Sequence, residues 1–372
     1  MDMQVPFVDL KRQHAPIMQQ IIDRVGQTIS SCQFIGGREL DQLCRELSDW
    51  WGVQGVAGVS SATLGLYAAL KAKGIGPGDE VLTTVHTAIP TSEAITMTGA
   101  RVTFCDIDPR TYLLDVDQAA KQINSRTRAV IPVHLYGQPA DMDKLMDMAR
   151  DNDLYVVEDC AQAQGAKFRG QMVGTIGDAA VLSFFPSKAL GTIGDAGAVT
   201  ARDPRLLERI RMFCNHGRSR KHWHEFEGTN SRMDNIKAAM LRVALPHLEQ
   251  WNSQRRQIAQ WYMERLQGVE DIVLPFCRKD CEHVYHLFVI LSRNRDELAG
   301  YLAQKSIGTG LHYPYALNQL PAYAYLQQGT GSFPVAEDVC SRVLSLPLFP
   351  GLTLEEVETV CSAIKDFYRS DP

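Results

Sequence analysis

The 372-residue sequence lacks the basic blocks and long apolar runs that would direct a protein to nucleic acid or into a membrane. Its formal net charge is −5, and no Lys/Arg-rich segment is interleaved with aromatic residues, so binding along a phosphate backbone is not expected. No uninterrupted apolar stretch is long enough to span a bilayer, and residues 1–10 contain no basic region followed by an apolar core. We therefore expect a cytoplasmic protein without a nucleic-acid or membrane partner.

The nine cysteines are too scattered to form a dense disulfide framework, and we expect free thiols, buried where the surrounding sequence is apolar. One cluster, Cys277, Cys281, His283 and His286, has residue types that bind zinc. The segment from His283 onward alternates as a β-strand does, which would point the two histidines to opposite faces of the strand. No metal site is therefore expected.

The segment from Ser183 to Lys188 places a lysine just after an apolar strand, in a loop closed by glycines. Desolvation of a lysine favours the neutral amine, which attacks carbonyl groups. Upstream, residues 154–158 have the pattern of a buried parallel strand that brings Asp159 to its carboxyl end, where open α/β sheets bind ligands. Together, the lysine and the aspartate suggest pyridoxal 5′-phosphate (PLP), with a Schiff base to Lys188 and a pyridine nitrogen kept protonated by Asp159.

Either residue alone has an ordinary explanation, since lysines after strands are mostly solvated and aspartates at strand ends often cap helices. A third element favours the cofactor. Residues 56–59 predict a short strand, and the small residues 60–63 then open a helix with Leu64, Tyr67 and Leu70 on one face. Such a turn can simply cap the helix, but its free N–H groups and the helix dipole also favour a phosphate.

These segments resemble the DegT/DnrJ/EryC1/StrS family of PLP-dependent sugar aminotransferases, which have an aspartate-aminotransferase-like fold (PLP fold type I). The resemblance begins at residues 5–10 and extends almost to the C-terminus. The other matching segments are residues 74–81, 158–163, 183–188, 228–232, 312–314 and 344–347.

The resemblance assigns a role to each matching residue. It makes Lys188 the Schiff-base lysine and proton shuttle, Asp159 the partner of the pyridine nitrogen, and Gln162 a neighbour of the cofactor ring. The residues that match the phosphate-binding positions are Ala62, Thr63, Ser183 and Asn230. The family's counterpart of the last residue reaches the phosphate from the other subunit, which implies a homodimer with shared active sites.

Three positions depart from the family pattern. An aromatic residue commonly stacks on the pyridine ring where this chain has Ala88, so another side chain, with His86 nearby in sequence, is a candidate to cover the ring. Many relatives have a histidine where this chain has Gln164, so no substrate role is transferred to that position. Asp195-Ala196-Gly197 replaces Asp-Gly-Gly, a change that we expect to be structural.

The family match also suggests substrate contacts. It places His312 and Tyr313 near the substrate entrance, and it gives the basic loop with His216 and Arg218 a contact with an acidic substrate. Surface packing and a plain loop are the alternatives for these two segments.

The rest of the chain alternates strands and helices, which predicts a mostly parallel sheet covered by helices. The expected strands are residues 80–85, 101–105, 129–133, 154–158, 180–184 and 197–200, of which the last resembles the family's antiparallel strand. A strand at 284–291 and helices at 142–152, 296–305 and 354–368 are also expected. Pro246 separates two helical patterns, so we expect a large PLP-binding domain at 1–245 and a small C-terminal α/β domain at 246–372.

The resemblance implies a transaminase that takes an amino group from glutamate, holds it as pyridoxamine phosphate, and passes it to a nucleotide-linked ketosugar. Family dehydratases carry histidine at the lysine position, so Lys188 favours transamination. Residues 188–197 resemble relatives that act at C3 more than those that act at C4. The alternatives are a 4-ketosugar aminotransferase, another fold-type-I PLP enzyme, and a catalytically silent regulatory or scaffold protein.

Overall fold

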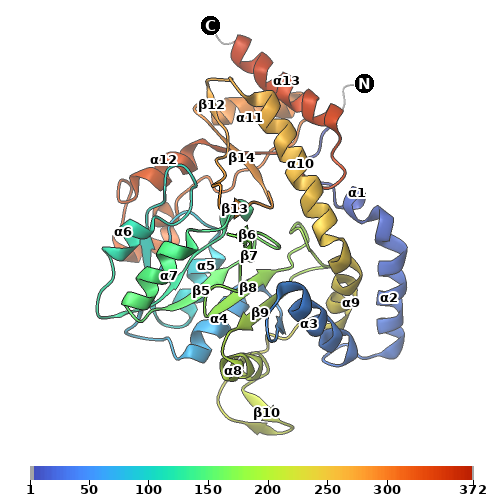
Figure 1. Cartoon of the computed structure of the whole chain (residues 1–372), viewed down its shortest axis with the longest axis vertical. Coiled ribbons are helices and arrows are strands. Elements are labelled where there is room, and N and C mark those ends of the chain that lie inside the picture. Colours follow the sequence, from blue (N-terminus) through green and yellow to red (C-terminus); the bar gives the residue numbers. More distant parts are fainter. Residues whose placement is uncertain (1–3, 371–372) are drawn as a thin grey trace.

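A computed structural model describes residues 4–370 and is built around a seven-stranded sheet (Figure 1). The strand order is β1-β9-β8-β5-β4-β2-β3. The strands of this sheet are β1 (Ala57–Val59), β2 (Glu80–Thr84), β3 (Arg101–Cys105), β4 (Thr127–Ile131), β5 (Tyr155–Asp159), β8 (Ala179–Ser183) and β9 (Gly197–Ala201).

The predicted parallel sheet and its antiparallel strand are both confirmed. β9 pairs antiparallel with β1 and β8, whereas the other strand pairs of this sheet are parallel. Every residue of β5 and β8 is buried. Both faces of these strands are covered, which explains why their sequences are apolar runs rather than alternating patterns.

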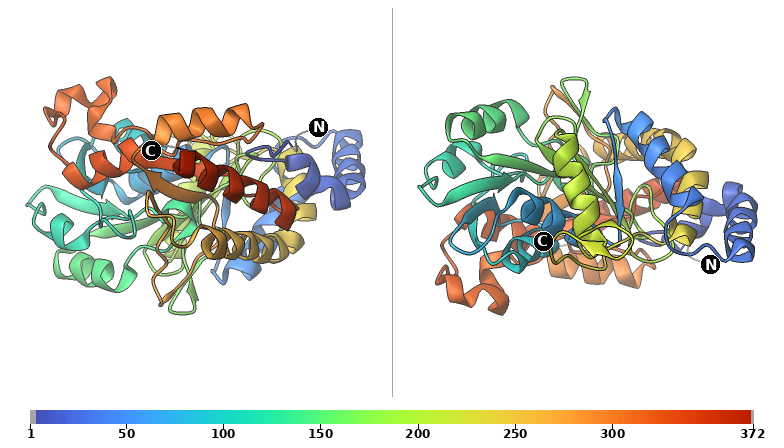
Figure 2. Two further views of the ribbon diagram at one scale, coloured as in Figure 1. Left: turned by 90° about the horizontal axis from the view of Figure 1, so that it is seen from above. Right: turned by 90° about the horizontal axis from the view of Figure 1, so that it is seen from below.

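Helices cover both faces of the sheet (Figure 2). Alternate residues of β8 divide between two apolar clusters, with Val181 packed on the side of α4, α5 and α8 and Leu182 on the side of α3 and α9. α7 covers the second face near β4 and β5. The helices are α1 (Leu10–His14), α2 (Met18–Ser31), α3 (Arg38–Trp51), α4 (Ala62–Lys73), α5 (Pro90–Met97), α6 (Val116–Ala120), α7 (Met142–Asp151), α8 (Pro204–Cys214), α9 (Asn235–Ala244), α10 (Leu248–Leu266), α11 (Arg295–Gln304), α12 (Pro334–Arg342) and α13 (Leu354–Ser370).

A smaller sheet, in the order β12-β14-β15, packs with α10, α11 and α13 around a separate apolar cluster. Its strands are β12 (Ile272–Val273), β14 (Phe288–Ser292) and β15 (Val343–Leu346). Val5, near the start of the chain, lies in this same cluster and bridges to Ile307. Pro246 lies in the short 3-10 turn Leu245–His247 between α9 and α10, and the domain division there stays a prediction.

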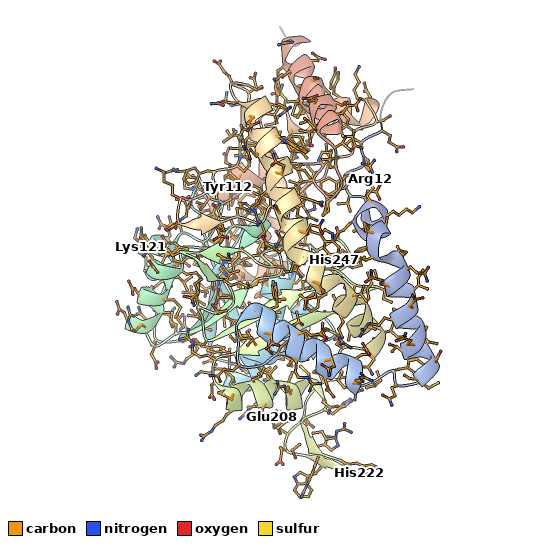
Figure 3. The ribbon with its side chains drawn as sticks, turned by 45° about the vertical axis from the view of Figure 1, so that its right-hand side comes forward. Arg12, Tyr112, Lys121, Glu208, His222 and His247 are labelled. Atoms are coloured by element: carbon orange, nitrogen blue, oxygen red, sulfur yellow. The ribbon has the colours of Figure 1, made fainter. Side chains whose placement is uncertain are left out.

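Two small antiparallel sheets complete the described strands. One consists of β6 (Lys167–Phe168), β7 (Gln171–Met172) and β13 (Cys281–Glu282), and the other is the hairpin of β10 (Arg218–Arg220) and β11 (Trp223–His224). This hairpin projects from the body of the molecule, with His222 near its tip (Figure 3). None of the helices in residues 4–370 is both long and apolar enough to cross a bilayer.

One local prediction was wrong. The strand expected at 284–291 begins only at Phe288, because Tyr285 has φ 48° and the amide of Val284 donates to the carbonyl of Gly137. His283 and His286 both precede this strand, so strand alternation does not set their side chains on opposite faces. The helix expected after residues 60–63 is present as α4, with the sheet on one side and α5 and α8 on another.

Candidate active site

Most of the predicted cofactor residues meet around a cavity of about 310 Å³ at the carboxyl ends of β5 and β8. Helix α4 begins at its rim, so the unpaired N–H groups of the first turn of α4 face the same region. The lining residues from the predicted set are Ala62, Thr63, Asp159, Gln162, Ser183, Lys188, His312 and Tyr313. Ala88, Thr91, Phe185 and His286 also line it.

The loop that carries Lys188 is held by Gln164. The Gln164 amide donates to the carbonyls of Ser183 at 2.7 Å and Leu190 at 3.1 Å, and its oxygen accepts from the Leu190 amide at 2.6 Å. These bonds join the two ends of the loop. Gln164 is 2% exposed and does not line the cavity, so this departure from the family pattern is a structural residue, a role that the sequence comparison did not suggest.

Glycine at position 191 makes the tight course of this loop possible. A Cβ atom added to Gly191 would lie 2.4 Å from the carbonyl oxygen of Pro186 and 2.8 Å from that of Phe185. The amide of Thr192 then returns to the carbonyl of Phe184 at 2.9 Å. The loop therefore folds back on the end of β8 and presents Lys188 to the cavity.

Asp159 is the last residue of β5 and is 5% exposed. Its carboxylate accepts hydrogen bonds from the Thr91 hydroxyl at 2.9 Å and from the Ala161 amide at 3.1 Å. Burial raises the pKa of Asp159 above its ordinary value, although these two bonds and the charge of Lys188 oppose the rise. A cationic group bound in the cavity would favour the charged carboxylate.

Burial also acts on Lys188. It lowers the pKa of the amine to about 8, against the nearby charge of Asp159, which raises it. A far larger fraction of the amine is therefore neutral near neutral pH than in a solvated lysine, and the neutral form is the nucleophile.

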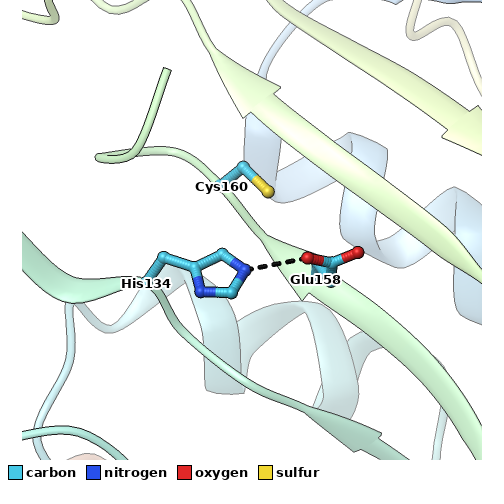
Figure 4. A group of neighbouring side chains, drawn as sticks. All are labelled: His134, Glu158 and Cys160. Atoms are coloured by element: carbon cyan, nitrogen blue, oxygen red, sulfur yellow. Dashed lines mark hydrogen bonds and ion pairs between the residues drawn. The ribbon is translucent and has the colours of Figure 1, made fainter. Parts of the chain in front are cut away.

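His134, Glu158 and Cys160 form a buried group at the end of β5 (Figure 4). The Ala140 amide donates to Nδ1 of His134 at 2.9 Å, so Nε2 carries the proton and donates to Glu158 at 3.0 Å. Glu158 also accepts from the amides of Gly174, Ile176 and Gly177. Burial alone would raise the pKa of Glu158, but the His134 contact and these amides lower it.

With Cys160, this pair has the spacing of metal ligands. However, both nitrogens of His134 are already used, and burial raises the pKa of the Cys160 thiol. The group therefore has a structural explanation: it fixes the end of β5 from behind.

Gln162 connects the cofactor side of the cavity to the predicted substrate segment. Its amide nitrogen donates to the Tyr313 hydroxyl at 3.0 Å, and its oxygen accepts from the Tyr136 amide at 2.7 Å. The His312 ring stacks on Phe7 with centroids 5.6 Å apart, and its Nδ1 contacts the Ser345 hydroxyl at 2.9 Å. Burial lowers the pKa of His312 to about 4, so this ring is neutral.

The phosphate-cup positions are brought together by close backbone packing. A Cβ atom on Gly197 would lie 2.8 Å from the Ala62 nitrogen and 2.8 Å from the Leu182 carbonyl oxygen. Only glycine therefore lets β9 pass the start of α4 at this distance. Ser61 caps α4 by accepting from the Leu64 amide at 3.2 Å, which leaves Ala62 and Thr63 at the cavity.

Four of the predicted site residues do not line this cavity. His86 is fully buried with its ring against Tyr136 and Cys340, so the structure does not bring it over the cofactor position. Asn230, His216 and Arg218 are exposed on the surface of this chain. Conversely, His286 lines the cavity although the sequence pattern assigned it to a strand, because the chain is irregular before Phe288.

The family model described as the DegT/DnrJ/EryC1/StrS aminotransferase family matches residues 16–365. The chain belongs to this family. The match confirms the predicted resemblance and the enzyme class, and it agrees with a cavity built from the family's lysine and aspartate positions.

Two curated relatives and one solved structure show the extent of the similarity. The chain is 40% identical to dTDP-3-amino-3,4,6-trideoxy-alpha-D-glucose transaminase of Streptomyces venezuelae, covering 98% of this chain and 96% of the relative. It is 40% identical to UDP-N-acetyl-3-dehydro-alpha-D-glucosamine 3-aminotransferase of Acidithiobacillus ferrooxidans, covering 97% of each. The crystal structure of S. venezuelae DesV in complex with a ketimine intermediate superposes with a TM-score of 0.96 at 40% identity, covering 98% of each chain. The predicted fold class is thereby confirmed.

The depressed pKa of Lys188 leads to a measurable pH dependence. The rate at which the apoenzyme captures added PLP should rise between pH 6 and 9 with a midpoint at about 8, since only the neutral amine reacts. Asp159→Asn should move this midpoint downward, because it removes the charge that raises the lysine pKa. N-acetyl-lysine amide, titrated in parallel with PLP, supplies the pH dependence of the reagent itself. An enzyme midpoint near that of the free amine, about 10.4, would contradict the assignment.

Proposed function

We propose that this aminotransferase moves an amino group from glutamate to C3 of a nucleotide-linked 3-ketosugar, using PLP. The observation that carries the proposal is the convergence of Lys188 and Asp159 in one buried cavity of an aminotransferase-family fold. The substrate class rests on the names of the relatives, which are a dTDP-3-amino sugar transaminase and a UDP-linked 3-aminotransferase. A cytoplasmic location, expected from the sequence, stays a prediction.

The residues of the cavity fit PLP. Lys188 supplies the amine for the aldehyde, Asp159 supplies a carboxylate for the pyridine nitrogen, and the start of α4 with Ser183 supplies donors for the phosphate. When bound, PLP supplies an electron sink that stabilises negative charge at the carbon next to the amine. A solved family structure 29% identical to this chain contains the cofactor PMP.

The chain's own groups supply the remaining requirements. The Lys188 amine can accept and return a proton at the reacting carbon, because a pKa of about 8 is close to neutral pH. Asp159, oriented by the Thr91 hydroxyl and the Ala161 amide, would hold the ring nitrogen of PLP in its protonated form. Gln162 and Tyr313, joined by a hydrogen bond, both line the cavity and would limit the position of a bound substrate there.

We further propose a homodimer with shared active sites. Asn230, which matches the family's phosphate-binding asparagine, is exposed in this chain and does not line the cavity. Apolar side chains near the Lys188 loop are also exposed, Phe185 by 49% and Ile193 by 48%. A second copy of the chain would cover these side chains and bring its own Asn230, His216 and Arg218 to the site.

Regiochemistry is tested by competition. With glutamate as donor and equal concentrations of the 3-keto and 4-keto isomers of one nucleotide sugar, mass spectrometry should show amination mainly of the 3-keto isomer. The control is Lys188→Ala, which should aminate neither isomer. Preference for the 4-keto isomer would overturn the C3 assignment while leaving the aminotransferase assignment intact.

Asn230→Ala tests the shared site. It should weaken PLP retention by about 1.5–3 kcal/mol, roughly tenfold or more, because a hydrogen bond to a charged group is lost. The matched control is Asn152→Ala, which alters an exposed asparagine at the end of α7. Analytical ultracentrifugation should show a dimer for all three proteins, and a fully active monomer would refute the proposal.

A further inference from the structure

A chain of buried side chains runs behind the substrate side of the cavity. Cys340 Sγ lies 3.1 Å from Nδ1 of His86, and Nε2 of His86 lies 2.8 Å from the hydroxyl of Tyr136. The Tyr136 hydroxyl in turn donates to the backbone carbonyl of His312. His86, Tyr136 and Cys340 are 0%, 6% and 1% exposed, and none of them lines the cavity.

The proton positions in this chain follow from its last acceptor. The His312 carbonyl can only accept, so the single hydroxyl proton of Tyr136 points to it. The Tyr136 oxygen must then accept from Nε2–H of His86, which leaves Nδ1 to accept from the Cys340 thiol. Each group is neutral in this arrangement. Burial lowers the pKa of His86 to about 4 and raises that of Cys340 to about 12, in agreement with these proton positions.

Tyr136 is also connected, through Gln162, to the residue that follows His312. Its backbone amide donates to Gln162, and Gln162 donates to the hydroxyl of Tyr313. Tyr136 therefore holds two consecutive cavity residues, one through its hydroxyl and the other through its amide and Gln162. These bonds form one connected network of buried polar groups.

This series of hydrogen-bonded side chains joins parts of the protein that are distant in sequence. His86 follows β2, Tyr136 follows β4, Cys340 lies in α12 and His312 lies in the loop before the 3-10 turn Leu317–Gln319. Gly310 pairs with Ser345 of β15, and Nδ1 of His312 contacts the Ser345 hydroxyl, so the loop is anchored on that side. The hydrogen bond from Tyr136 holds the His312 backbone from the side of β4.

We propose that His86, Tyr136 and Cys340 are positioning residues that fix the His312–Tyr313 segment for binding of the sugar substrate. This rests on the proposed function, in which the segment lies at the substrate entrance. These hydrogen bonds end on the His312–Tyr313 segment and not on Lys188 or Asp159. Their loss should therefore affect the reaction of the ketosugar and spare the reaction of glutamate. His86 thus has a role other than covering the cofactor ring.

Tyr136→Phe is the central variant, because it removes the hydroxyl and retains both the ring and the amide bond to Gln162. The matched control is Tyr155→Phe, which removes a buried phenol hydroxyl that has no hydrogen-bond partner among the described residues. Two further variants test His86: His86→Phe removes both ring bonds, and His86→Gln retains an N–H that can donate to Tyr136.

Stopped-flow absorbance of the PLP-loaded dimer measures the two half-reactions separately, with glutamate and then with the nucleotide ketosugar that the parent enzyme converts best. Tyr136→Phe and His86→Phe should raise the half-saturating ketosugar concentration about tenfold, the effect of losing roughly one buried hydrogen bond. The glutamate half-reaction should change by less than about twofold, and His86→Gln should recover most of the ketosugar binding. The proposal would be overturned if Tyr136→Phe and His86→Phe had the same half-saturating ketosugar concentration as Tyr155→Phe. It would also be overturned if they slowed both half-reactions equally.

Hydrogen exchange provides a readout that does not depend on the substrate. Peptides covering residues 308–316 should exchange faster in Tyr136→Phe and His86→Phe than in the parent enzyme or Tyr155→Phe. If the parent enzyme converts no nucleotide ketosugar, the proposed function fails. Hydrogen exchange alone then decides whether His86, Tyr136 and Cys340 hold the His312–Tyr313 segment. Unchanged exchange in both variants would refute the positioning role.

Discussion

The active site depends on keeping a lysine amine in the protein interior, beside an aspartate, without tying the two into a permanent ion pair. Burial disfavours the charged amine, and Asp159 partly offsets this, which brings the pKa of Lys188 to about 8. A deeper site without the aspartate would hold the amine neutral but would leave nothing for the ring nitrogen of PLP. A solvated site would keep the amine protonated and unreactive at neutral pH.

Much of the surrounding structure maintains this balance. β5 delivers Asp159, and the His134–Glu158 pair fixes the end of that strand from behind. Gln164 fixes the Lys188 loop, because its three hydrogen bonds join Ser183 to Leu190. On the substrate side, the hydrogen bonds of Tyr136 hold the His312–Tyr313 segment, which follows the point where Gly310 pairs with β15. Positioning therefore comes from buried polar groups that never line the cavity.

The sequence predicted the parts of the fold that follow from local pattern. β3 has the predicted bounds, and the antiparallel strand lies where residues 197–200 were expected. Lys188 and Asp159 were predictable because each follows an apolar strand. The roles of Gln164 and His86 could not be predicted from local sequence, because their hydrogen-bond partners lie 19 to 254 residues away in the chain. The irregular segment before Phe288 was also missed, because pairing with the carbonyls of Gly137 and Tyr136 outweighs its strand-like alternation.

The central claim is that one lysine carries both the cofactor and the proton transfers. The most direct test is steady-state transamination by Lys188→Ala, with Lys167→Ala, a half-buried lysine paired with Glu282, as the control. Circular dichroism should show that both variants fold as the parent enzyme does. The account predicts that Lys188→Ala loses the absorbance band of lysine-bound PLP and all measurable turnover, whereas Lys167→Ala retains both. Sustained turnover by folded Lys188→Ala would contradict it.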